Sequence, residues 1–443
     1  MKKMVFALFA TLAAPAIVSA AMAEHVGRKK IDGIDVLTYP TAIHDVVTIL
    51  GALPAGTALA LANRQNVSVA VLTAMMLDQG TTKEDKFAIA KRLEGVGATI
   101  QFTTRDQPLR IQARCLKKDL PLVLELMAEQ LRSPAFNVSE FERVRQQYIG
   151  ELKNRSDDVQ ARSSEAFRRA VFPAGHPNYA ASTAESLAAA QNVTLEQVKA
   201  FHHEHYGPSH MTLVLVGDVN LAQARSAMGT AFRGWKGGTD YLRDSEPATL
   251  SQPPEHTTTV DIPGKTSTVL TIGQATGLRD KDPESLALDV GTVVLGSGFT
   301  GRLMHAVRDQ EGLTYGVGAQ LANNVFSDGS WQVSGSFAPQ LLDRGTISTQ
   351  REVQRWWKDG ITDQELAARK TFLVGSYQVG LATTSEMAGM LLNTVLTGRD
   401  LTWLDEYPKA IQTLTLEQVN TAIKRHLDPD KMVVIKAGTL PSS

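Results

Sequence analysis

The chain has 443 residues, of which 43% are hydrophobic and 21% charged, and its formal net charge is −1 at pH 7. This length exceeds a single hydrophobic core and predicts about two domains. The near-neutral charge, with neither a Lys/Arg-rich run nor basic residues interleaved with aromatic ones, argues against nucleic acid as a partner.

The amino terminus has the pattern of a secretory signal peptide. Lys2 and Lys3 precede an apolar stretch, residues 4–18, that is shorter than a membrane-spanning helix needs. Small residues follow and offer two cleavage motifs, Val18-Ser19-Ala20 and Ala21-Met22-Ala23. We therefore assign residues 1–23 to a signal peptide and predict a periplasmic location, with no stable membrane span.

Helices and strands follow one another in mixed order through the rest of the chain. The predicted capping boxes, each of which marks a helix start, are Ser139/Glu142, Thr194/Gln197, Thr362/Glu365 and Thr415/Gln418. The predicted strands are residues 45–50, 99–104, 110–116, 211–216, 258–262, 267–272, 315–321, 330–337 and 432–436. Because no regular βαβ alternation appears, we predict an α+β fold with antiparallel-rich sheets packed by helices.

A repeated pentapeptide indicates a tandem duplication. Thr-Leu-Glu-Gln-Val occurs at residues 194–198 and again at 415–419, and further identities hold the same offset. They pair His205 with His426, Pro208 with Pro429, Met211 with Met432 and Gly217 with Gly438. Two copies of one unit are predicted, at residues 24–236 and 258–443, joined by a linker rich in Gly and Pro at 237–257.

Several segments resemble the pitrilysin/insulinase family of zinc peptidases, which includes the mitochondrial processing peptidase. The resemblance covers nearly the whole chain after the signal peptide and implies two homologous α+β domains. The segments that carry it are residues 53–57, 69–81, 94–98, Gly175-His176-Pro177, Tyr206-Gly207-Pro208, Gly217-Asp218-Val219 and 298–315.

The family's zinc motif is missing from this chain. Active members carry His-x-x-Glu-His on a helix four residues before Gly-Thr; the two His hold zinc and the Glu takes a proton from the bound water. Counting back from Gly80 puts these positions at Val71, Ala74 and Met75, of which only Met75 has even a thioether. The family's third ligand falls near Glu151. The resemblance therefore implies that this chain builds no zinc site.

One histidine-rich segment offers a rival metal site. His202-His203-Glu204-His205 places His202 and His205 one helical turn apart. However, the duplication preserves only His205, and the spacing also suits an exposed helix. We therefore interpret this segment as ordinary helix.

The second copy keeps a different pair of residues. In two-chain members of the family, the subunit without zinc supplies an Arg and a Tyr to the shared active site, and the resemblance assigns these roles to Arg308 and Tyr315. We expect a helix at residues 302–308 with Leu303, Ala306 and Val307 inward and Arg308 off the buried stripe. The alternative is that Arg308 is a surface charge and Tyr315 an amphipathic strand residue.

A glycine-rich segment precedes this pair. Gly296, Gly298 and Gly301 match Gly-x-Gly-x-x-Gly, but a dinucleotide site requires a strand before the loop, and residues 284–295 read as a helix. In related non-zinc subunits a glycine-rich loop at this place contacts substrate. We therefore expect peptide contact at Gly296, Gly298 and Gly301, with a plain turn as the alternative.

These patterns favour the non-zinc subunit of a heterodimeric zinc metallopeptidase, inactive alone, that degrades peptides in a closed chamber. The expected partner is a homologous subunit with a His-x-x-Glu-His motif, and zinc is expected in that subunit only. A non-catalytic scaffold or peptide-binding homologue is the main alternative. An independent hydrolase has less support, since no Gly-x-Ser-x-Gly is present and the single Cys115 is typical of buried packing.

Overall fold

A computed structural model of the protein describes residues 21–63, 65–104, 107–242 and 257–440. The predicted signal peptide lies outside the described residues except for 21–23, and so does residue range 243–256 of the predicted linker. Among the described residues we find no helix with the length and apolarity to span a membrane.

The strands form two sheets. The first contains β1 (Gly27–Ile31), β2 (Ile34–Pro40), β3 (Val46–Pro54), β4 (Thr99–Thr104), β5 (Pro108–Leu116) and β6 (Thr212–Gly217). The second contains β7 (Thr257–Asp261), β8 (Thr268–Ala275), β9 (Thr314–Ala322), β10 (Ser330–Phe337) and β11 (Val433–Gly438).

The two sheets share one topology. Their strand orders are β1-β2-β6-β3-β5-β4 and β7-β11-β8-β10-β9, so β2 to β6 correspond to β7 to β11 and only β1 is extra. In each sheet one pair is parallel, β2 with β6 and β7 with β11, and the remaining pairs are antiparallel. The predicted α+β fold with two antiparallel-rich domains is confirmed.

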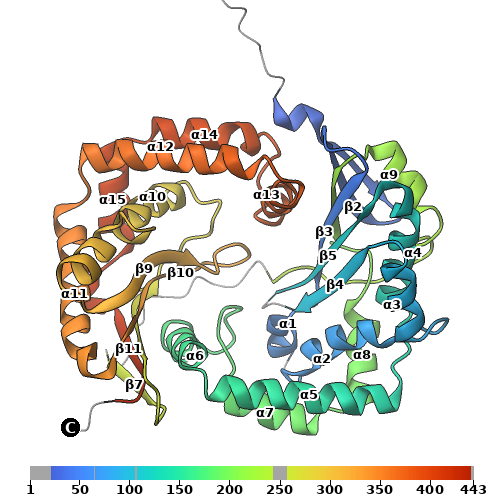
Figure 1. Cartoon of the computed structure of the whole chain (residues 1–443), viewed down its shortest axis with the longest axis horizontal. Helices are drawn as coiled ribbons and strands as arrows, with labels where there is room; N and C mark the ends of the chain where they lie inside the picture. Colours follow the sequence, from blue (N-terminus) through green and yellow to red (C-terminus); the bar gives the residue numbers. More distant parts are fainter. Residues whose placement is uncertain (1–20, 64, 105–106, 243–256, 441–443) are drawn as a thin grey trace, which may run out of the picture.

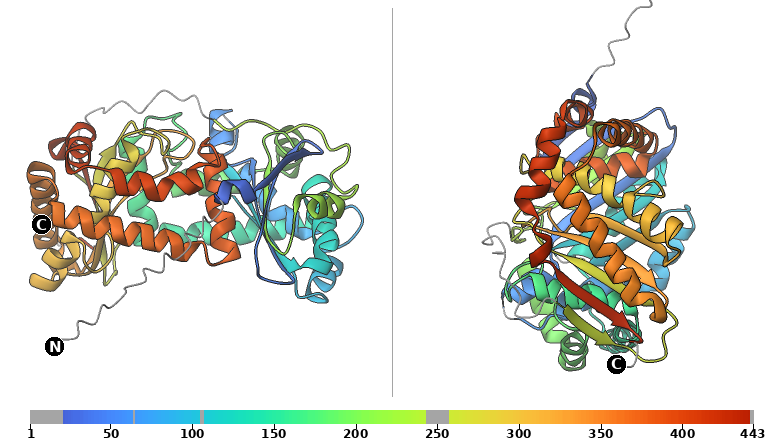
Figure 2. Two further views of the ribbon diagram at one scale, coloured as in Figure 1. Left: turned by 90° about the horizontal axis from the view of Figure 1, so that it is seen from above. Right: turned by 90° about the vertical axis from the view of Figure 1, so that its left-hand side faces the viewer.

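The helices surround both sheets (Figure 1). In chain order they are α1 (Thr57–Ala62), α2 (Val69–Met76), α3 (Lys86–Glu94), α4 (Leu120–Arg132), α5 (Val138–Ser156), α6 (Val159–Val171), α7 (Thr183–Asn192), α8 (Leu195–His205), α9 (Leu221–Met228), α10 (Ser285–Gly296), α11 (Leu342–Asp359), α12 (Asp363–Gly380), α13 (Thr384–Leu396), α14 (Trp403–Thr413) and α15 (Leu416–His426). One face of the first sheet packs against α2, α4 and α8, and the corresponding face of the second packs against α10, α11 and α15. The views in Figure 2 show α12 and α14 side by side along one edge of the molecule.

One helix from each half of the chain packs on the sheet of the other half. Helix α6, from the first half, packs on β8 and β11, and α13, from the second half, packs on β3 and β6. Figure 1 shows both helices between the facing sheets. Because helices cover both faces, β6 and β8 are buried along their whole lengths, which explains the nearly continuous apolar sequence of β6.

The two exchanged helices make matching hydrogen bonds. The Thr384 hydroxyl of α13 lies 2.8 Å from that of Thr48 on β3. The Ser163 hydroxyl of α6 lies 2.8 Å from that of Thr271 on β8, the strand that corresponds to β3. The duplication therefore extends to the contacts between the halves.

A buried histidine also joins the halves, through the Gly175-His176-Pro177 motif. His176 Nδ1 accepts a hydrogen bond from the Asn178 N–H at 3.1 Å, so the ring proton lies on Nε2 and is donated to Asp328 at 2.8 Å. Both side chains are almost inaccessible, and Phe172 stacks on the imidazole at 4.6 Å. This motif thus has a structural role in fixing the loop that follows α6 to the β9–β10 connection.

Some local predictions were wrong. The capping box predicted at Ser139/Glu142 is absent: Asn137 caps α5, and its side chain accepts from the N–H groups of Ser139 and Glu140. The β1–β2 hairpin was missed, although its turn, Asp32-Gly33, has φ values of 48° and 90° and is a strong hairpin signal. The other three predicted capping boxes are confirmed.

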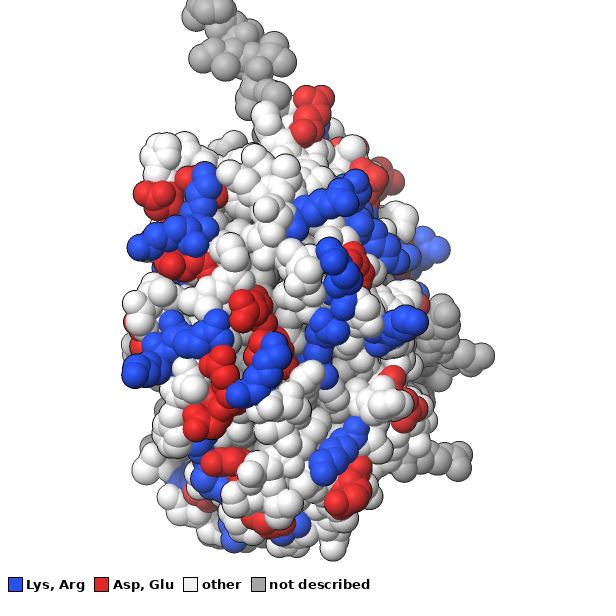
Figure 3. All heavy atoms as spheres, turned by 90° about the vertical axis from the view of Figure 1, so that its right-hand side faces the viewer, with Lys and Arg blue, Asp and Glu red and all other residues white. Residues whose placement is uncertain are grey.

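Charge is mixed on the outer surface of the first domain. Figure 3 shows Lys and Arg interspersed with Asp and Glu on this face, without a large area of one sign. The first domain also contains surface ion pairs, such as Lys83 with Glu129 at 2.5 Å. The face thus lacks the basic stripe that nucleic-acid binding requires.

Candidate active site

The positions that correspond to the zinc motif lie on α2 as predicted. Val71 and Met75 are partly exposed on one side of the helix, and Ala74 is buried at 3% exposure. Apart from Thr73, all the residues of α2 are apolar. These side chains do not fit zinc, because they provide neither imidazole, carboxylate nor thiolate.

Glu151 does not provide a zinc site in place of the missing ligands. It lies exposed on α5, which packs beside α2, and accepts a hydrogen bond from Gln147 at 3.0 Å. Within the part of the chain that the structure describes, no three His, Cys, Asp or Glu side chains gather as metal ligands would.

The histidines of α8 are occupied by other contacts. His202 Nε2 lies 2.8 Å from the Leu131 carbonyl oxygen, and His205 Nδ1 lies 3.0 Å from the Thr239 hydroxyl. Burial lowers the pKa of both imidazoles. His203 is exposed. The rings of His202 and His205 therefore make packing and hydrogen-bond contacts within the first domain.

Cys115 is buried in the first core at 4% exposure, as predicted. Burial, followed by the charge of Asp119, raises the pKa of its thiol to about 12. A thiol that stays protonated is a poor nucleophile, so the structure gives no support to a cysteine hydrolase.

The segment that carries Arg308 is a π-helix rather than the expected α-helix. It spans Met304–Gln310, and its wider turn is closed by a hydrogen bond from the Glu311 N–H to the Ala306 carbonyl at 3.2 Å. Leu303, Ala306 and Val307 point inward as predicted, and Arg308 is partly exposed. Such π-helical turns are rare and are often found at functional sites.

Arg308 lies close to two exposed aromatic rings. Its guanidinium carbon is 5.3 Å from the ring centre of Tyr315 and 5.2 Å from that of Phe299. Tyr315 is 87% exposed and Phe299 is 75% exposed, far more than large aromatic side chains usually are. Cation–π attraction to both rings orients the guanidinium, and no described carboxylate lies within ion-pair distance of it.

Phe299 belongs to the glycine-rich segment. Residues Gly298 to Thr300 are exposed, and Gly298 has φ +66° with open space around it. Gly296 and Gly301 are buried instead; a Cβ on Gly296 would lie 2.1 Å from the Ala319 nitrogen of β9. Of the three predicted contact residues, only Gly298 is therefore at the exposed tip. Since α10 precedes the loop, the dinucleotide fingerprint lacks its strand.

Sequence reasoning missed Phe299. The available signal was its place in the sequence Gly298-Phe299-Thr300-Gly301, because burial is not expected for an aromatic residue in a glycine-rich turn.

A bidentate ion pair fixes the start of this segment. Arg302 donates from Nε and a terminal nitrogen to Glu365 at 2.6 and 2.7 Å, and also to the Gly360 carbonyl at 3.0 Å. Glu365 is in turn the capping-box residue of α12. Burial works to raise the pKa of Glu365, but hydrogen bonds from Arg302 and Thr362 lower it to about 2.

This pair predicts a defined loss of stability in acid. Because the folded-state pKa is below the ordinary 4.5, the stabilisation is present above about pH 4.5 and disappears as the pH falls toward 2. Glu365→Gln should lower the free energy of unfolding by about 1 kcal/mol near neutrality, after allowance for solvent screening. Urea unfolding at several pH values measures the gap between variant and wild type, which should close in acid. The exposed Glu417 gives a control, Glu417→Gln, and a gap that ignores pH would contradict the prediction.

Comparison with known proteins gives a consistent result. The profile of Insulinase (Peptidase family M16) matches residues 61–178, and that of the Peptidase M16 inactive domain matches residues 192–373. A protein called non-peptidase homolog YmxG of Helicobacter pylori is 25% identical over 372 residues, 83% of this chain and 84% of that protein. An uncharacterized zinc protease of Mycobacterium tuberculosis is 26% identical over 366 residues, 80% of this chain and 79% of that protein.

A solved structure shares the fold. The crystal structure of a peptidase M16 inactive domain from Pseudomonas fluorescens superposes with a TM-score of 0.85 at 24% identity, covering 94% of this chain and 98% of that one. The two profiles together match most of the chain, and the motifs quoted from the sequence fall largely within them. The chain therefore belongs to peptidase family M16, the insulinase family, and carries no zinc-binding residues at the positions of the family's metal motif.

Proposed function

We propose that this chain is the non-zinc subunit of a heterodimeric zinc metallopeptidase of the periplasm, which degrades peptides or unfolded segments in a closed chamber. The homologous partner supplies the zinc, its ligands and the general-base Glu. This chain supplies Arg308, Tyr315 and part of the chamber wall. Its own contribution is to bind and orient the substrate carbonyl.

The observation that carries this proposal is the state of Arg308. Its positive charge has no described carboxylate beside it, and the rings of Phe299 and Tyr315 hold the guanidinium at the surface. A charge that only stabilised the fold would be expected to have a carboxylate partner, as Arg302 has in Glu365. Arg308 is therefore free to meet negative charge on a bound molecule.

The chemistry of peptide hydrolysis matches this arrangement. Attack of water on a peptide carbonyl moves negative charge onto the carbonyl oxygen. A guanidinium and a phenol O–H directed at that oxygen stabilise the transition state more than the ground state, which raises the rate. Neither group needs to carry or transfer a proton for this purpose.

Purification of the chain from its native source tests the proposal. We expect a homologue with His-x-x-Glu-His to co-purify, zinc in the complex, and chelator-sensitive cleavage of peptides. The separated chain should contain no zinc and cleave nothing. Chelator-sensitive hydrolysis of peptides by the isolated chain, freed of contaminants, would contradict the proposal.

A non-catalytic scaffold or peptide-binding protein is the second candidate. The Helicobacter pylori relative bears the name non-peptidase homolog, which favours a role without cleavage for that protein. The absence of any gene nearby for a similar-length His-x-x-Glu-His protein, together with peptide binding by the isolated chain, would support this candidate over the first.

A further inference from the structure

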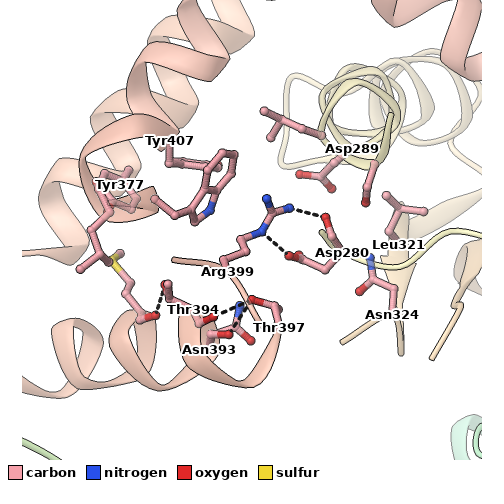
Figure 4. Close-up of a pocket in the computed structure, with 15 residues that line it drawn as sticks. Asp280, Asp289, Leu321, Asn324, Tyr377, Asn393, Thr394, Thr397, Arg399 and Tyr407 are labelled. Carbon is pink, nitrogen blue, oxygen red and sulfur yellow. Dashed lines mark hydrogen bonds and ion pairs between the residues drawn. The ribbon is translucent and has the colours of Figure 1, made fainter. Parts of the chain in front are cut away.

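A partly open cavity of about 300 Å³ lies in the second domain, among residues that the proposed active site does not use. Its walls come from α10, α12, α13 and α14, and from the segments that follow β8 and β9. The volume is at the lower end of the range for small-molecule sites. Figure 4 shows how polar and aromatic side chains from these elements surround one space.

The one guanidinium in this cavity is already paired. Arg399 donates from Nε to the Asp280 carboxylate at 3.0 Å and from a terminal nitrogen to the Asp280 carbonyl oxygen, contacts that are dashed in Figure 4. Its guanidinium carbon also lies 4.0 Å from the ring centre of Trp403. Arg399 and Asp280 therefore cancel each other's charge.

Asp289 has no such partner. It lines the cavity from α10, on the side that faces Arg399 in Figure 4, and makes neither a hydrogen bond nor an ion pair with any described residue. Burial, followed by the charge of Asp280, raises the pKa of Asp289 to about 6, so the carboxylate is still ionised above neutrality. A carboxylate held in this state is stabilised by any cation that reaches it.

Aromatic rings form another part of the cavity wall, on the opposite side of Arg399 from Asp289 in the view of Figure 4. The rings of Tyr377 and Tyr407 lie 4.9 Å apart, and Trp403 meets Tyr407 edge-on at 5.9 Å. The Tyr377 hydroxyl donates a hydrogen bond to the Leu404 carbonyl oxygen at 2.7 Å, so Tyr377 would contact a ligand through its ring. Aromatic faces attract ammonium groups, and alkyl chains pack well on them.

We propose that this cavity binds a small organic cation, with its ammonium group on Asp289 and its apolar part against Tyr377, Trp403 and Tyr407. A metal ion is disfavoured because one free carboxylate is too few ligands. An anion is disfavoured because Arg399 is neutralised by Asp280. The site shares no residue with Arg308, Phe299 and Tyr315.

Occupation of the cavity has a structural consequence. The cavity wall includes the end of α13 and the residue that follows it, through Met390, Asn393, Thr394 and Thr397. Helix α13 is the helix that packs on the first domain's sheet. A ligand on Asp289 of α10 therefore connects the body of the second domain to this exchanged helix. Binding should raise the thermal stability of the whole chain.

Calorimetric titration of the intact chain with alkylammonium ions from butyl to hexyl tests the proposal, with alcohols and carboxylates of equal length as neutral and anionic probes. We expect saturable ammonium binding, with alcohols weaker by about ten- to hundredfold and carboxylates weaker still. Asp289→Asn should remove the preference for ammonium over alcohol. Asp359→Asn, which changes an exposed Asp at the end of α11, is the matched control and should leave it intact.

Acid gives a second readout. Since Asp289 must be ionised, ammonium affinity should fall about tenfold per pH unit below its pKa of about 6. The other titratable groups around the cavity are Asp280, Arg399, Tyr377 and Tyr407, and burial raises the pKa of both tyrosines. Ammonium binding that is the same at about pH 8 and about pH 5 would contradict the role of Asp289.

A cavity-filling variant covers the case in which Asp289→Asn does not fold. Leu286→Trp places a large side chain in the cavity and should weaken ammonium binding at least tenfold. Equal binding of ammonium and alcohol by the wild-type chain, or unchanged binding in Leu286→Trp, overturns the proposal.

Discussion

Arg308→Ala should lower kcat for peptide cleavage by the proposed two-chain complex about two to three orders of magnitude. The guanidinium is partly exposed, lies against the rings of Phe299 and Tyr315, and has no described carboxylate to neutralise it. If it stabilises the oxyanion, its loss raises the barrier for the chemical step more than it weakens substrate binding. The measurement is steady-state kinetics of the complex, in which kcat should fall far more than KM rises.

Tyr315→Phe separates the phenol from the ring. The variant keeps the aromatic contact with Arg308 at 5.3 Å and removes only the O–H donor, so it should slow cleavage less than Arg308→Ala. Because the two residues touch, the double variant should cost less than the sum of the single effects. Arg355→Ala, at an exposed arginine of α11, is the control. A double variant that cleaves as fast as wild type removes Arg308 and Tyr315 from the mechanism.

Gly217→Ala should lower the free energy of unfolding by about 2–5 kcal/mol. Gly217 ends β6 with φ +135°, a backbone conformation that other residues rarely adopt. An added Cβ would also lie 2.0 Å from the Val46 carbonyl oxygen, which accepts a hydrogen bond from the Asp218 N–H. The clash is with backbone of the neighbouring strand, so no side-chain rotation relieves it.

Two other glycines calibrate this effect in urea unfolding. Gly438, the duplicate of Gly217, has φ +122° and a Cβ there would be 3.0 Å from the Ser267 carbonyl oxygen, so Gly438→Ala should be milder. Gly150 lies inside α5 with open space around it, and Gly150→Ala should stabilise the chain by about 0.5–1 kcal/mol. Equal stability of Gly217→Ala and wild type would show that the strand ends are not strained.

Local signals predicted much of the fold because they depend on neighbours in sequence. The capping boxes predicted at Thr194, Thr362 and Thr415 are present. In each, the Thr hydroxyl and the side chain three residues later accept hydrogen bonds from each other's backbone N–H groups, so the motif does not depend on what surrounds the helix. Ser139 was wrong for the same kind of reason: Asn137, two residues earlier, is also a good cap and starts the helix first. Strand interiors were found, whereas strand ends depend on pairing partners that the pattern does not reveal.

The sequence by itself determined that zinc has no ligands at Val71, Ala74 and Met75, because absent side-chain atoms cannot be restored by folding. It also determined the duplicated unit, which the common strand order confirms. Only the tertiary structure decided which sheet α6 and α13 cover, because an apolar stripe marks a buried face without naming what buries it. It alone brought Phe299 to Arg308, since a loop tip meets a π-helical side chain only through the path of the backbone between them.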